Sequence, residues 1–274
     1  MNLTIGMSAY DDFDGVYFTV QSLRLYHDLK DTEILVVDNN PSSNHGKATK
    51  HFLDSIGCKY ISYENKTGTS VRNEIFRNAQ GKYTLCVDCH VLLKVGFLDS
   101  LLNYYKEHED CKDILSGPLC DDNFNVVSTQ FDPVWRCHMY GTWGFDKEKY
   151  ESGNPFEIPM MGLGVFSCET KNWLWFNEDF HGFGAEEGYI HEKFRQAGGK
   201  AICIPKLHWM HRFGRPGGTK YPNKMEDRIW NYFIGWLELT KDPDHQIIKD
   251  IKEHFKECQK VDEVFAQAKE HYGL

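Results

Sequence analysis

An apolar run passes directly into residues that can bind a metal in Tyr83-Thr84-Leu85-Cys86-Val87-Asp88-Cys89-His90. Tyr83–Val87 predicts a strand, and Asp88 and His90 follow at its end. In an extended chain, residues i and i+2 point to the same side. Asp88 and His90 can therefore bind one metal ion while Cys89 points away, and a carboxylate with an imidazole suits Mn²⁺ or a similar divalent ion.

Two alternative interpretations of this stretch stay open on the residues alone. Asp88-Cys89-His90 also fits a strand end with a solvated Asp and a surface His. Cys86-Val87-Asp88-Cys89 has the CxxC spacing of a metal or redox motif. Thiols three residues apart on a strand face opposite sides, however, and no second CxxC completes a zinc site. The CxxC interpretation is therefore the weaker one.

Predicted strands and helices alternate along the amino-terminal part of the chain. We expect strands and helices in turn at Leu3–Met7, Val16–Leu29, Ile34–Val37, Lys47–Ile56, Lys59–Tyr63, Ser70–Gln80 and Tyr83–Val87. This order predicts an α/β fold, a mostly parallel sheet with helices on both faces. Ligands bind beyond the carboxyl ends of such strands, which draws attention to Ser8–Tyr10, Asp38–Asn40 and Asp88–His90.

The second half of the chain has a looser pattern. We expect strands at Asp113–Leu119, Asn125–Gln130, Leu163–Cys168 and Ala201–Ile204, and a helix at Glu186–Gln196. Phe131–Pro159, rich in aromatic, Gly and Pro residues, indicates a loop region. Arg212–Asn223 indicates a flexible segment before two helices, Met225–Thr240 and Asp244–Lys269. We therefore divide the chain into a domain at 1–215 and a flexible loop with a helical extension at 216–274.

The composition of the 274 residues excludes several classes of protein. The formal net charge of −9 gives no sign of the broad basic face used to bind nucleic acid nonspecifically. No apolar run approaches the roughly 18 residues of a membrane span, and the start lacks the features of a signal peptide. The nine cysteines have no repeating spacing. We expect reduced thiols in a soluble, cytoplasmic protein.

Five motifs occur in a characteristic order. They are Val36-Val37-Asp38-Asn39-Asn40, Gly68-Thr69-Ser70-Val71-Arg72-Asn73, Asp88-Cys89-His90, Met161-Gly162-Leu163-Gly164-Val165-Phe166 and Phe183-Gly184-Ala185-Glu186-Glu187. Each is weak alone, but together they are specific. Over roughly residues 2 to 215 the chain resembles GT-A fold glycosyltransferases, both family 2-type enzymes and the catalytic domain of the polypeptide N-acetylgalactosaminyltransferases, for which Asp-x-His is characteristic.

The resemblance implies the residues of a UDP-sugar site. The donor would contact Ser8, Ala9, Tyr10, Asp38, Gly68, Arg72, Val87, Asp88, Gly162 and Arg212. The metal, Mn²⁺ or alternatively Mg²⁺, would be held by Asp88, His90 and His211, with His208 as a competitor for the third position. Arg215 and Lys220 are candidates to contact the diphosphate. Asp38 also fits a turn cap, and Arg72 a solvated helical residue.

Glu186 and Glu187 are the candidate catalytic residues. By resemblance Glu186 would bind hydroxyls of the donor sugar, whereas carboxylates at the start of a helix also fit a merely electrostatic role. Glu187 stands where inverting relatives carry a general base and where retaining relatives carry an amide. The Asp-x-His motif favours retention. Trp135 and Trp143 are candidates to stack on a sugar or base, with core packing as the alternative.

The sequence therefore predicts a metal-dependent glycosyltransferase that moves a sugar from a UDP-sugar to an acceptor hydroxyl, on a glycan or lipid-linked precursor. One alternative acceptor is a hydroxymethylated pyrimidine in DNA, for which His208–Lys220 would supply a local basic rim. An alternative of another class is a noncatalytic module that binds nucleotide sugars. The transferred sugar and the oligomeric state stay open.

Overall fold

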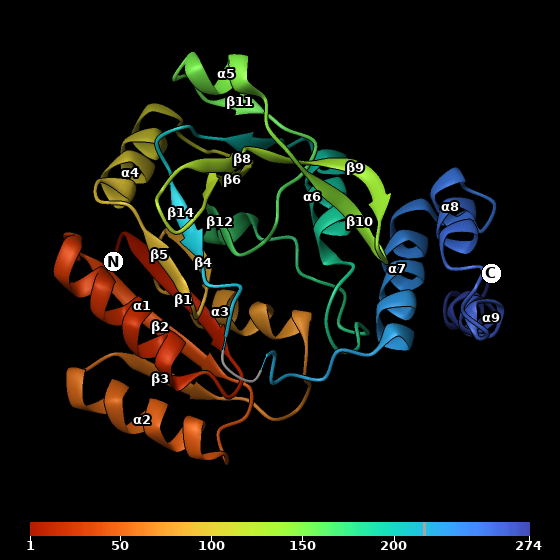
Figure 1. Ribbon diagram of the computed structural model, residues 1–274, viewed down its shortest axis with the longest axis horizontal. Helices are drawn as coiled ribbons and strands as arrows, with labels where there is room; N and C mark the ends of the chain where they lie inside the picture. The colour runs from red at the N-terminus through yellow and green to blue at the C-terminus, as the bar shows by residue number, and fades with distance from the viewer. Residues whose placement is uncertain (216–217) are drawn as a thin grey trace.

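The computed structural model describes residues 1–215 and 218–274, and its centre is an eight-stranded sheet with the order β11-β13-β6-β12-β4-β1-β2-β3 (Figure 1). Strands β1 to β4 pair in parallel, as do β6 and β13. Strands β11 and β12 run antiparallel to their neighbours. The predicted α/β fold with a large central sheet and a C-terminal helical region is confirmed.

The secondary-structure elements have the following bounds. The strands are β1 (Leu3–Ala9), β2 (Thr32–Asp38), β3 (Lys59–Ser62), β4 (Tyr83–Asp88), β5 (Val91–Leu93), β6 (Ile114–Ser116), β7 (Leu119–Cys120), β8 (Val126–Ser128), β9 (Gln130–Arg136), β10 (Met139–Gly144), β11 (Phe156–Glu157), β12 (Val165–Glu169), β13 (Ala201–Cys203) and β14 (Trp209–His211). The helices are α1 (Phe13–Tyr26), α2 (Asn44–Ile56), α3 (Arg72–Asn78), α4 (Phe97–Glu107), α5 (Lys147–Glu151), α6 (Glu186–Gln196), α7 (Met225–Thr240), α8 (Gln246–His254) and α9 (Val261–Tyr272). Short 3₁₀ turns lie at Thr69–Val71 and Thr170–Asn172.

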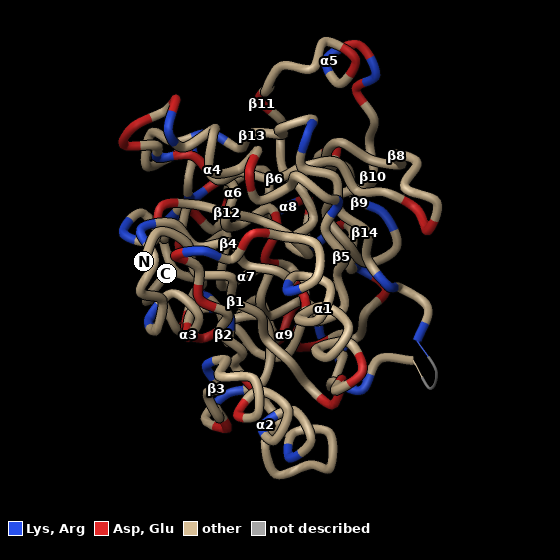
Figure 2. Tube along the Cα trace, turned by 90° about the vertical axis from the view of Figure 1, so that its left-hand side faces the viewer, with Lys and Arg blue, Asp and Glu red and all other residues tan. Residues whose placement is uncertain are grey.

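Helices α1, α2 and α3 cover the amino-terminal half of the sheet. Helix α3 lies so close to β1 that a Cβ at Gly6 would meet the side chain of Ile75, so Gly6 permits this packing. Helices α1 and α2 pack against each other (Figure 1). Charged residues of both signs are interspersed over the elements (Figure 2), in keeping with the mixed composition of the sequence.

A second sheet, ordered β5-β14-β7-β8, lies beyond the carboxyl end of β4. Strand β14 pairs antiparallel with β5, and His211 stands opposite Val91. The amide of Arg212 also donates to the carbonyl of His90. This register places residues 90 and 211, far apart in sequence, beside each other.

The segment Phe131–Pro159 contains a hairpin and a short helix, so the expectation of a loop there is wrong. Strands β9 and β10 pair antiparallel, joined by Cys137 and His138. Both residues have positive φ (47° and 65°), as the two-residue turns of hairpins of type I′ require. The Gly and Pro residues suggested a loop, but aromatic and β-branched residues of the segment favour strands.

The C-terminal region differs from the expected single helix over Asp244–Lys269. The helix is interrupted between α8 and α9. Both of these helices pack beside α7, which itself packs on α6. Helix α4 is a further element that the sequence analysis did not predict. Part of the expected flexible segment, 216–217, where the proposed extension starts, lies outside the described residues. Within the described part, no helix is long and apolar enough to span a membrane.

Candidate active site

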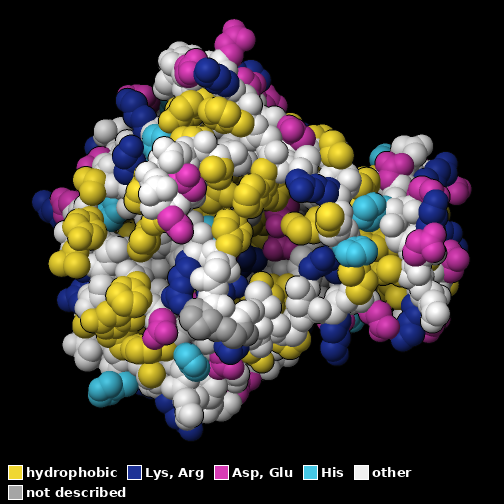
Figure 3. Space-filling model, in the orientation of Figure 1, with side chains coloured by type: hydrophobic (Ala, Val, Ile, Leu, Met, Phe, Trp, Pro, Cys, Tyr) yellow, Lys and Arg dark blue, Asp and Glu magenta, His cyan; other side chains and the backbone are white. Residues whose placement is uncertain are grey.

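A cleft of about 870 Å³ opens at the carboxyl ends of β1 and β4. Its other walls come from hairpin β9–β10, the loop before α6 and the chain after β14. Figure 3 shows the molecule hollowed near the centre of this face, with acidic and basic side chains gathered around the hollow. Of the predicted donor-site residues, the lining includes Ser8, Ala9, Tyr10, Gly68, Arg72, Asp88, Gly162 and Arg212.

Asp88, His90 and His211 converge on one side of this cleft. Nε2 of His211 lies 3.4 Å from Oδ2 of Asp88 and 3.2 Å from Nε2 of His90. One ligand atom from each residue lies within 4.8 Å of the others. Two imidazole nitrogens and a carboxylate oxygen turned towards one point are a donor set that fits a divalent ion.

Asp12 is the immediate partner of His90. Its Oδ2 lies 2.8 Å from Nδ1 of His90, and its Oδ1 accepts from the amide of Gly15 and so caps α1. Burial raises the pKa of Asp12, but the hydrogen bond and charge of His90, with the amide of Gly15 and the charge of Arg215, leave this pKa below its usual value. With Nδ1 donating to Asp12, Nε2 of His90 carries no proton, which is the state in which an imidazole nitrogen can bind a metal.

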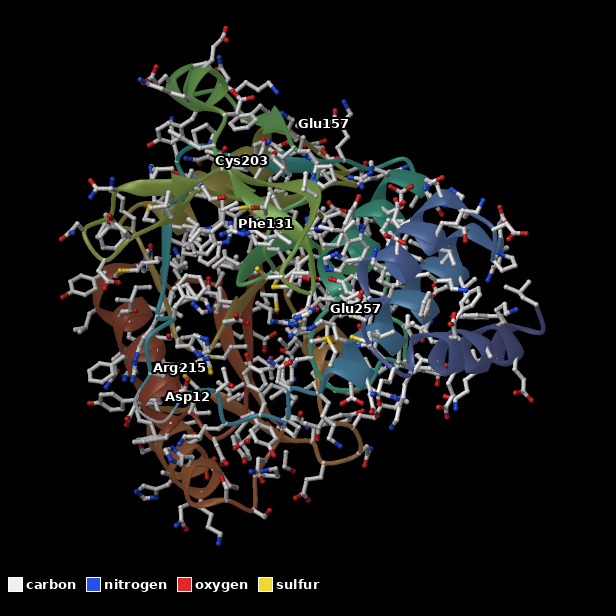
Figure 4. All side chains as sticks on the ribbon, turned by 45° about the vertical axis from the view of Figure 1, so that its right-hand side comes forward. Asp12, Phe131, Glu157, Cys203, Arg215 and Glu257 are labelled. Atoms are coloured by element: carbon white, nitrogen blue, oxygen red, sulfur yellow. The ribbon has the colours of Figure 1, made fainter. Side chains whose placement is uncertain are left out.

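Arg215 lies beside the same two residues. Its Nη1 is 3.6 Å from Oδ2 of Asp12 and within 2.8 Å of both ring nitrogens of His90. Figure 4 shows Asp12 and Arg215 side by side, the first just before α1 and the second after β14. The chain after β14 therefore brings a cation to the cluster that holds His90.

Arg72 joins the two acidic parts of the site. The buried guanidinium donates to Oδ1 of Asp88 at 2.9 Å and to Oε1 of Glu186 at 3.4 Å. Burial lowers the pKa of Arg72, but the two carboxylates outweigh it and raise that pKa. Burial likewise acts to raise the pKa of Asp88, yet Arg72 and the neighbouring imidazoles hold it well below its usual range. Arg72 thus fixes an ionised Asp88 and positions Glu186.

Glu186 and Glu187 are the first residues of α6. Glu186 is buried, and its Oε2 has no hydrogen-bond partner among the described residues. Burial, followed by the charge of Glu186, raises the pKa of Glu187 to about 8. The pair therefore offers the cleft an acceptor oxygen and a carboxyl group that keeps its proton at neutral pH.

The family of the protein that carries this cleft is evident from its sequence. The sequence profile of glycosyl transferase family 2 matches residues 4–182, well over half of the chain. The chain belongs to this family. Among curated proteins, no sequence matches the chain.

Solved structures show the GT-A fold of this family 2 chain. GalNAc-T7 with UDP, GalNAc and Mn²⁺ superposes with a TM-score of 0.74 at 16% identity, over 100% of this chain and 54% of that one. TarS of S. aureus with UDP-GlcNAc gives 0.57 at 14%, over 98% and 79%. The mannosyltransferase PcManGT of Pyrobaculum calidifontis with GDP-Man and Mn²⁺ gives 0.57 at 14%, over 97% and 72%. The chain spans about half the length of GalNAc-T7.

The structure does not bring every predicted residue of the family 2 site into the cleft. Asp38 is buried, and its carboxylate accepts from the amide of Asn40 at 2.9 Å and from the hydroxyl of Tyr60 at 3.0 Å, an arrangement typical of a turn cap. Burial raises the pKa of Asp38. Val87 is buried within β4. A donor role of Asp38 and Val87 stays a prediction.

Of the three remaining candidates, His208, Trp135 and Trp143, only Trp143 lines the cleft. His208 lies outside the cleft lining, where its Nε2 pairs with the hydroxyl of Tyr150 at 2.9 Å. Trp135 packs against Tyr232 and other aromatic rings, as in a core. Trp143 is 51% exposed on the cleft wall, and its ring lies 5.5 Å from that of Phe213.

Asp12 and Arg228 are among the charged residues of this cleft that the sequence did not indicate. Asp12 follows β1, so the rule that directs attention to strand ends would have found it. Arg228 comes from α7 and lines the cleft close to Gly184. No motif marks Arg228, and its position becomes visible only when α7 packs against α6.

Proposed function

We propose that this family 2 glycosyltransferase moves a sugar from a UDP-sugar to an acceptor hydroxyl, with a divalent ion, Mn²⁺ in preference to Mg²⁺, held by Asp88, His90 and His211. The acceptor hydroxyl is that of a glycan or lipid-linked precursor. The observation that carries the proposal is the convergence of these three side chains in the cleft that also holds Arg72, Glu186 and Glu187. The UDP and Mn²⁺ of the GalNAc-T7 structure support the choice of donor and metal.

Each charged residue has a separate task in this proposal. A bound divalent ion would neutralise the charge that builds on the diphosphate as the glycosidic bond breaks. Arg72 keeps Asp88 ionised and turns Glu186 into the cleft. Glu186 accepts hydrogen bonds from hydroxyls of the donor sugar through the oxygen that has no protein partner. Arg212 and Lys220, both on the cleft wall, contact the diphosphate.

Glu187 favours a retaining reaction. With a pKa of about 8, its carboxyl group is largely protonated at pH 7. A protonated carboxyl group donates a hydrogen bond and is not ready to remove a proton from the acceptor. It can therefore replace the amide that the resemblance assigns to this position in retaining relatives.

The experiment that tests the proposal measures UDP release from UDP-GlcNAc, UDP-GalNAc, UDP-glucose and UDP-galactose, with Mn²⁺, with Mg²⁺ and with EDTA. We expect turnover of at least one donor with Mn²⁺ and loss of turnover with EDTA. Binding of UDP without turnover of any donor would favour the noncatalytic module instead. Acceptors are then screened by mass spectrometry among glycans, lipid-linked precursors and hydroxymethylated DNA, and NMR of the product anomer distinguishes retention from inversion.

A further inference from the structure

Asn231, a fully buried polar residue of α7, binds the loop that carries the glutamate pair. Its Oδ1 accepts from the amide of His181 at 2.7 Å. Its Nδ2 donates to the carbonyls of His181 and Gly184, at 2.7 and 3.1 Å. One side chain thus satisfies three backbone groups of a loop whose own conformation supplies no regular hydrogen bonds to them.

The loop needs this support because its backbone is unusual. Gly182, Gly184 and Ala185 have φ values of 51°, 100° and 75°. Ala185 is not a glycine, and its Cβ makes a left-handed backbone unfavourable. Such a conformation persists where the surroundings determine it. Ala185 immediately precedes Glu186, so the direction in which α6 starts depends on how the loop is held.

The other side of the loop is fixed by the segment before α3. The amide of Thr69 donates to the carbonyl of Gly182 at 2.9 Å. Gly68 lies so close that a Cβ there would stand 1.9 Å from this carbonyl oxygen. The loop is therefore held between the start of α3, which carries Arg72, and the face of α7 that carries Asn231.

The same face of α7 contributes two further contacts, one turn earlier. A Cβ at Gly182 would stand 2.7 Å from a carboxylate oxygen of Asp227, and a Cβ at Gly184 would stand 2.8 Å from Nε of Arg228. Residues three and four apart share a helix face, so Asp227, Arg228 and Asn231 form one surface. The glycines of the loop fit this surface, and Arg228 extends from it into the cleft.

We infer that Asn231 is a positioning residue of the active site, and that α7 supports the active site although it follows the 1–215 segment. This inference rests on the proposed function of Glu186 and Glu187. Asn231 touches neither carboxylate; it acts by fixing the backbone from which both side chains extend. Residues 218–274 are therefore required for turnover, through α7, and not only for stability.

The test compares Asn231→Asp with Tyr272→Phe. Asn231→Asp keeps the size and one acceptor oxygen but replaces the donor that holds two carbonyls. Tyr272→Phe removes hydroxyl contacts with Asn177 and with the carbonyl of Ile234 in α7, so it weakens the docking of α7 and α9 without touching the loop. A misplacement of about 1 Å costs roughly 100-fold in rate. We expect kcat to fall roughly 10- to 100-fold in Asn231→Asp only, with UDP affinity by calorimetry unchanged in both variants.

Hydrogen exchange read by mass spectrometry gives a measurement that does not depend on activity. Peptides covering 181–187 should exchange faster in Asn231→Asp than in the wild-type protein or Tyr272→Phe. If Asn231→Asp does not fold, Asn231→Ser retains a smaller donor and acceptor and takes its place. Unchanged exchange over 181–187 overturns the inference even if no donor is turned over. Faster exchange with unchanged kcat in an active enzyme also overturns it.

Discussion

Asp12 uses its two carboxylate oxygens for two separate tasks. One caps the amide of Gly15 at the start of α1, and the other orients His90. A carboxylate behind a metal-binding histidine fixes the tautomer and makes the imidazole a better ligand. The side chain therefore ties the position of a helix to the orientation of a candidate ligand.

Asp12→Asn should separate these tasks. Asn caps a helix as well as Asp does, so α1 should remain intact. The variant loses the charge that faces His90, and loss of such a partner lowers metal affinity roughly 10- to 100-fold. Calorimetric titration with Mn²⁺ measures this loss, while circular dichroism checks the fold. An unchanged Mn²⁺ affinity would contradict the role assigned to Asp12.

The two histidines after Pro205 give a matched pair of variants for the metal site. His211→Ala should abolish Mn²⁺ binding and turnover, because it removes one of the three converging side chains proposed as ligands. His208→Ala should leave Mn²⁺ binding intact, since His208 pairs with Tyr150 away from the cleft. Mn²⁺ binding followed by electron paramagnetic resonance distinguishes them. Equal losses in both variants would mean that His211 is not a specific ligand.

Glu187 should make the stability of the protein fall as pH rises. Its pKa of about 8 lies above the ordinary value of 4.5, because of burial and the charge of Glu186, which Arg72 and Arg228 only partly offset. Its stabilising contribution is therefore complete below pH 4.5 and lost as pH rises through 8. Glu187→Gln cannot ionise at this position, so its stability lacks this dependence on pH. The melting temperature of the wild-type protein should fall relative to that of Glu187→Gln from pH 4.5 to 8, and a constant difference would contradict the raised pKa.

At the scale of elements, the longer strands of the central sheet were predictable, whereas the short strands β5 and β14 were not. The runs at β1, β2 and β4 are short and apolar, and each is followed by polar residues at its carboxyl end. Their side chains therefore predict both a sheet and the edge where ligands bind. The strands β5 and β14 have only three residues each. Their pairing sets His211 against Val91, and no local pattern reveals this long-range contact.

Hairpin β9–β10 shows why composition misled the sequence analysis. Pro133 and several glycines in this region are typical of loops, but a two-stranded ribbon consists of edge strands, which tolerate proline. Similarly, the residues between α8 and α9 include charged residues typical of an exposed helix. The composition therefore does not show that the helix ends and the chain turns there. The burial of Phe255 and Val261 at this turn comes from packing on other helices, so it is a tertiary effect.

At the scale of the whole molecule, the C-terminal helices join the sheet domain through a shared polar network. Glu238 of α7 accepts from Lys193 and Tyr189 of α6 and from Asn177, at 2.6 to 2.7 Å. Both ends of the Lys193–Glu238 ion pair are only 23% exposed. The network crosses from residues before 215 to residues after 218, so the two parts share one packed interior.

The protein should therefore unfold in a single transition. Calorimetry and circular dichroism should give coincident curves, because α7 packs on α6 in the same core. Glu238→Ala should lower the stability by about 1–3 kcal/mol, since three donors lose their acceptor. Glu257→Ala, at an exposed position beyond α8, should leave it unchanged. Two separate transitions in the wild-type protein would show that the parts fold independently.

The turn of hairpin β9–β10 provides a site for chemical labelling. Cys137 is exposed at its tip on the wall of the cleft, whereas the other eight thiols are buried or half-buried. Thiols react as exposed thiolates, and burial raises the pKa of those at Cys86, Cys111 and Cys203. A maleimide fluorophore should therefore attach to the wild-type chain at Cys137 first. The dye would stand on the wall of the cleft, so its emission would report the filling of the cleft in the wild-type protein without an introduced cysteine.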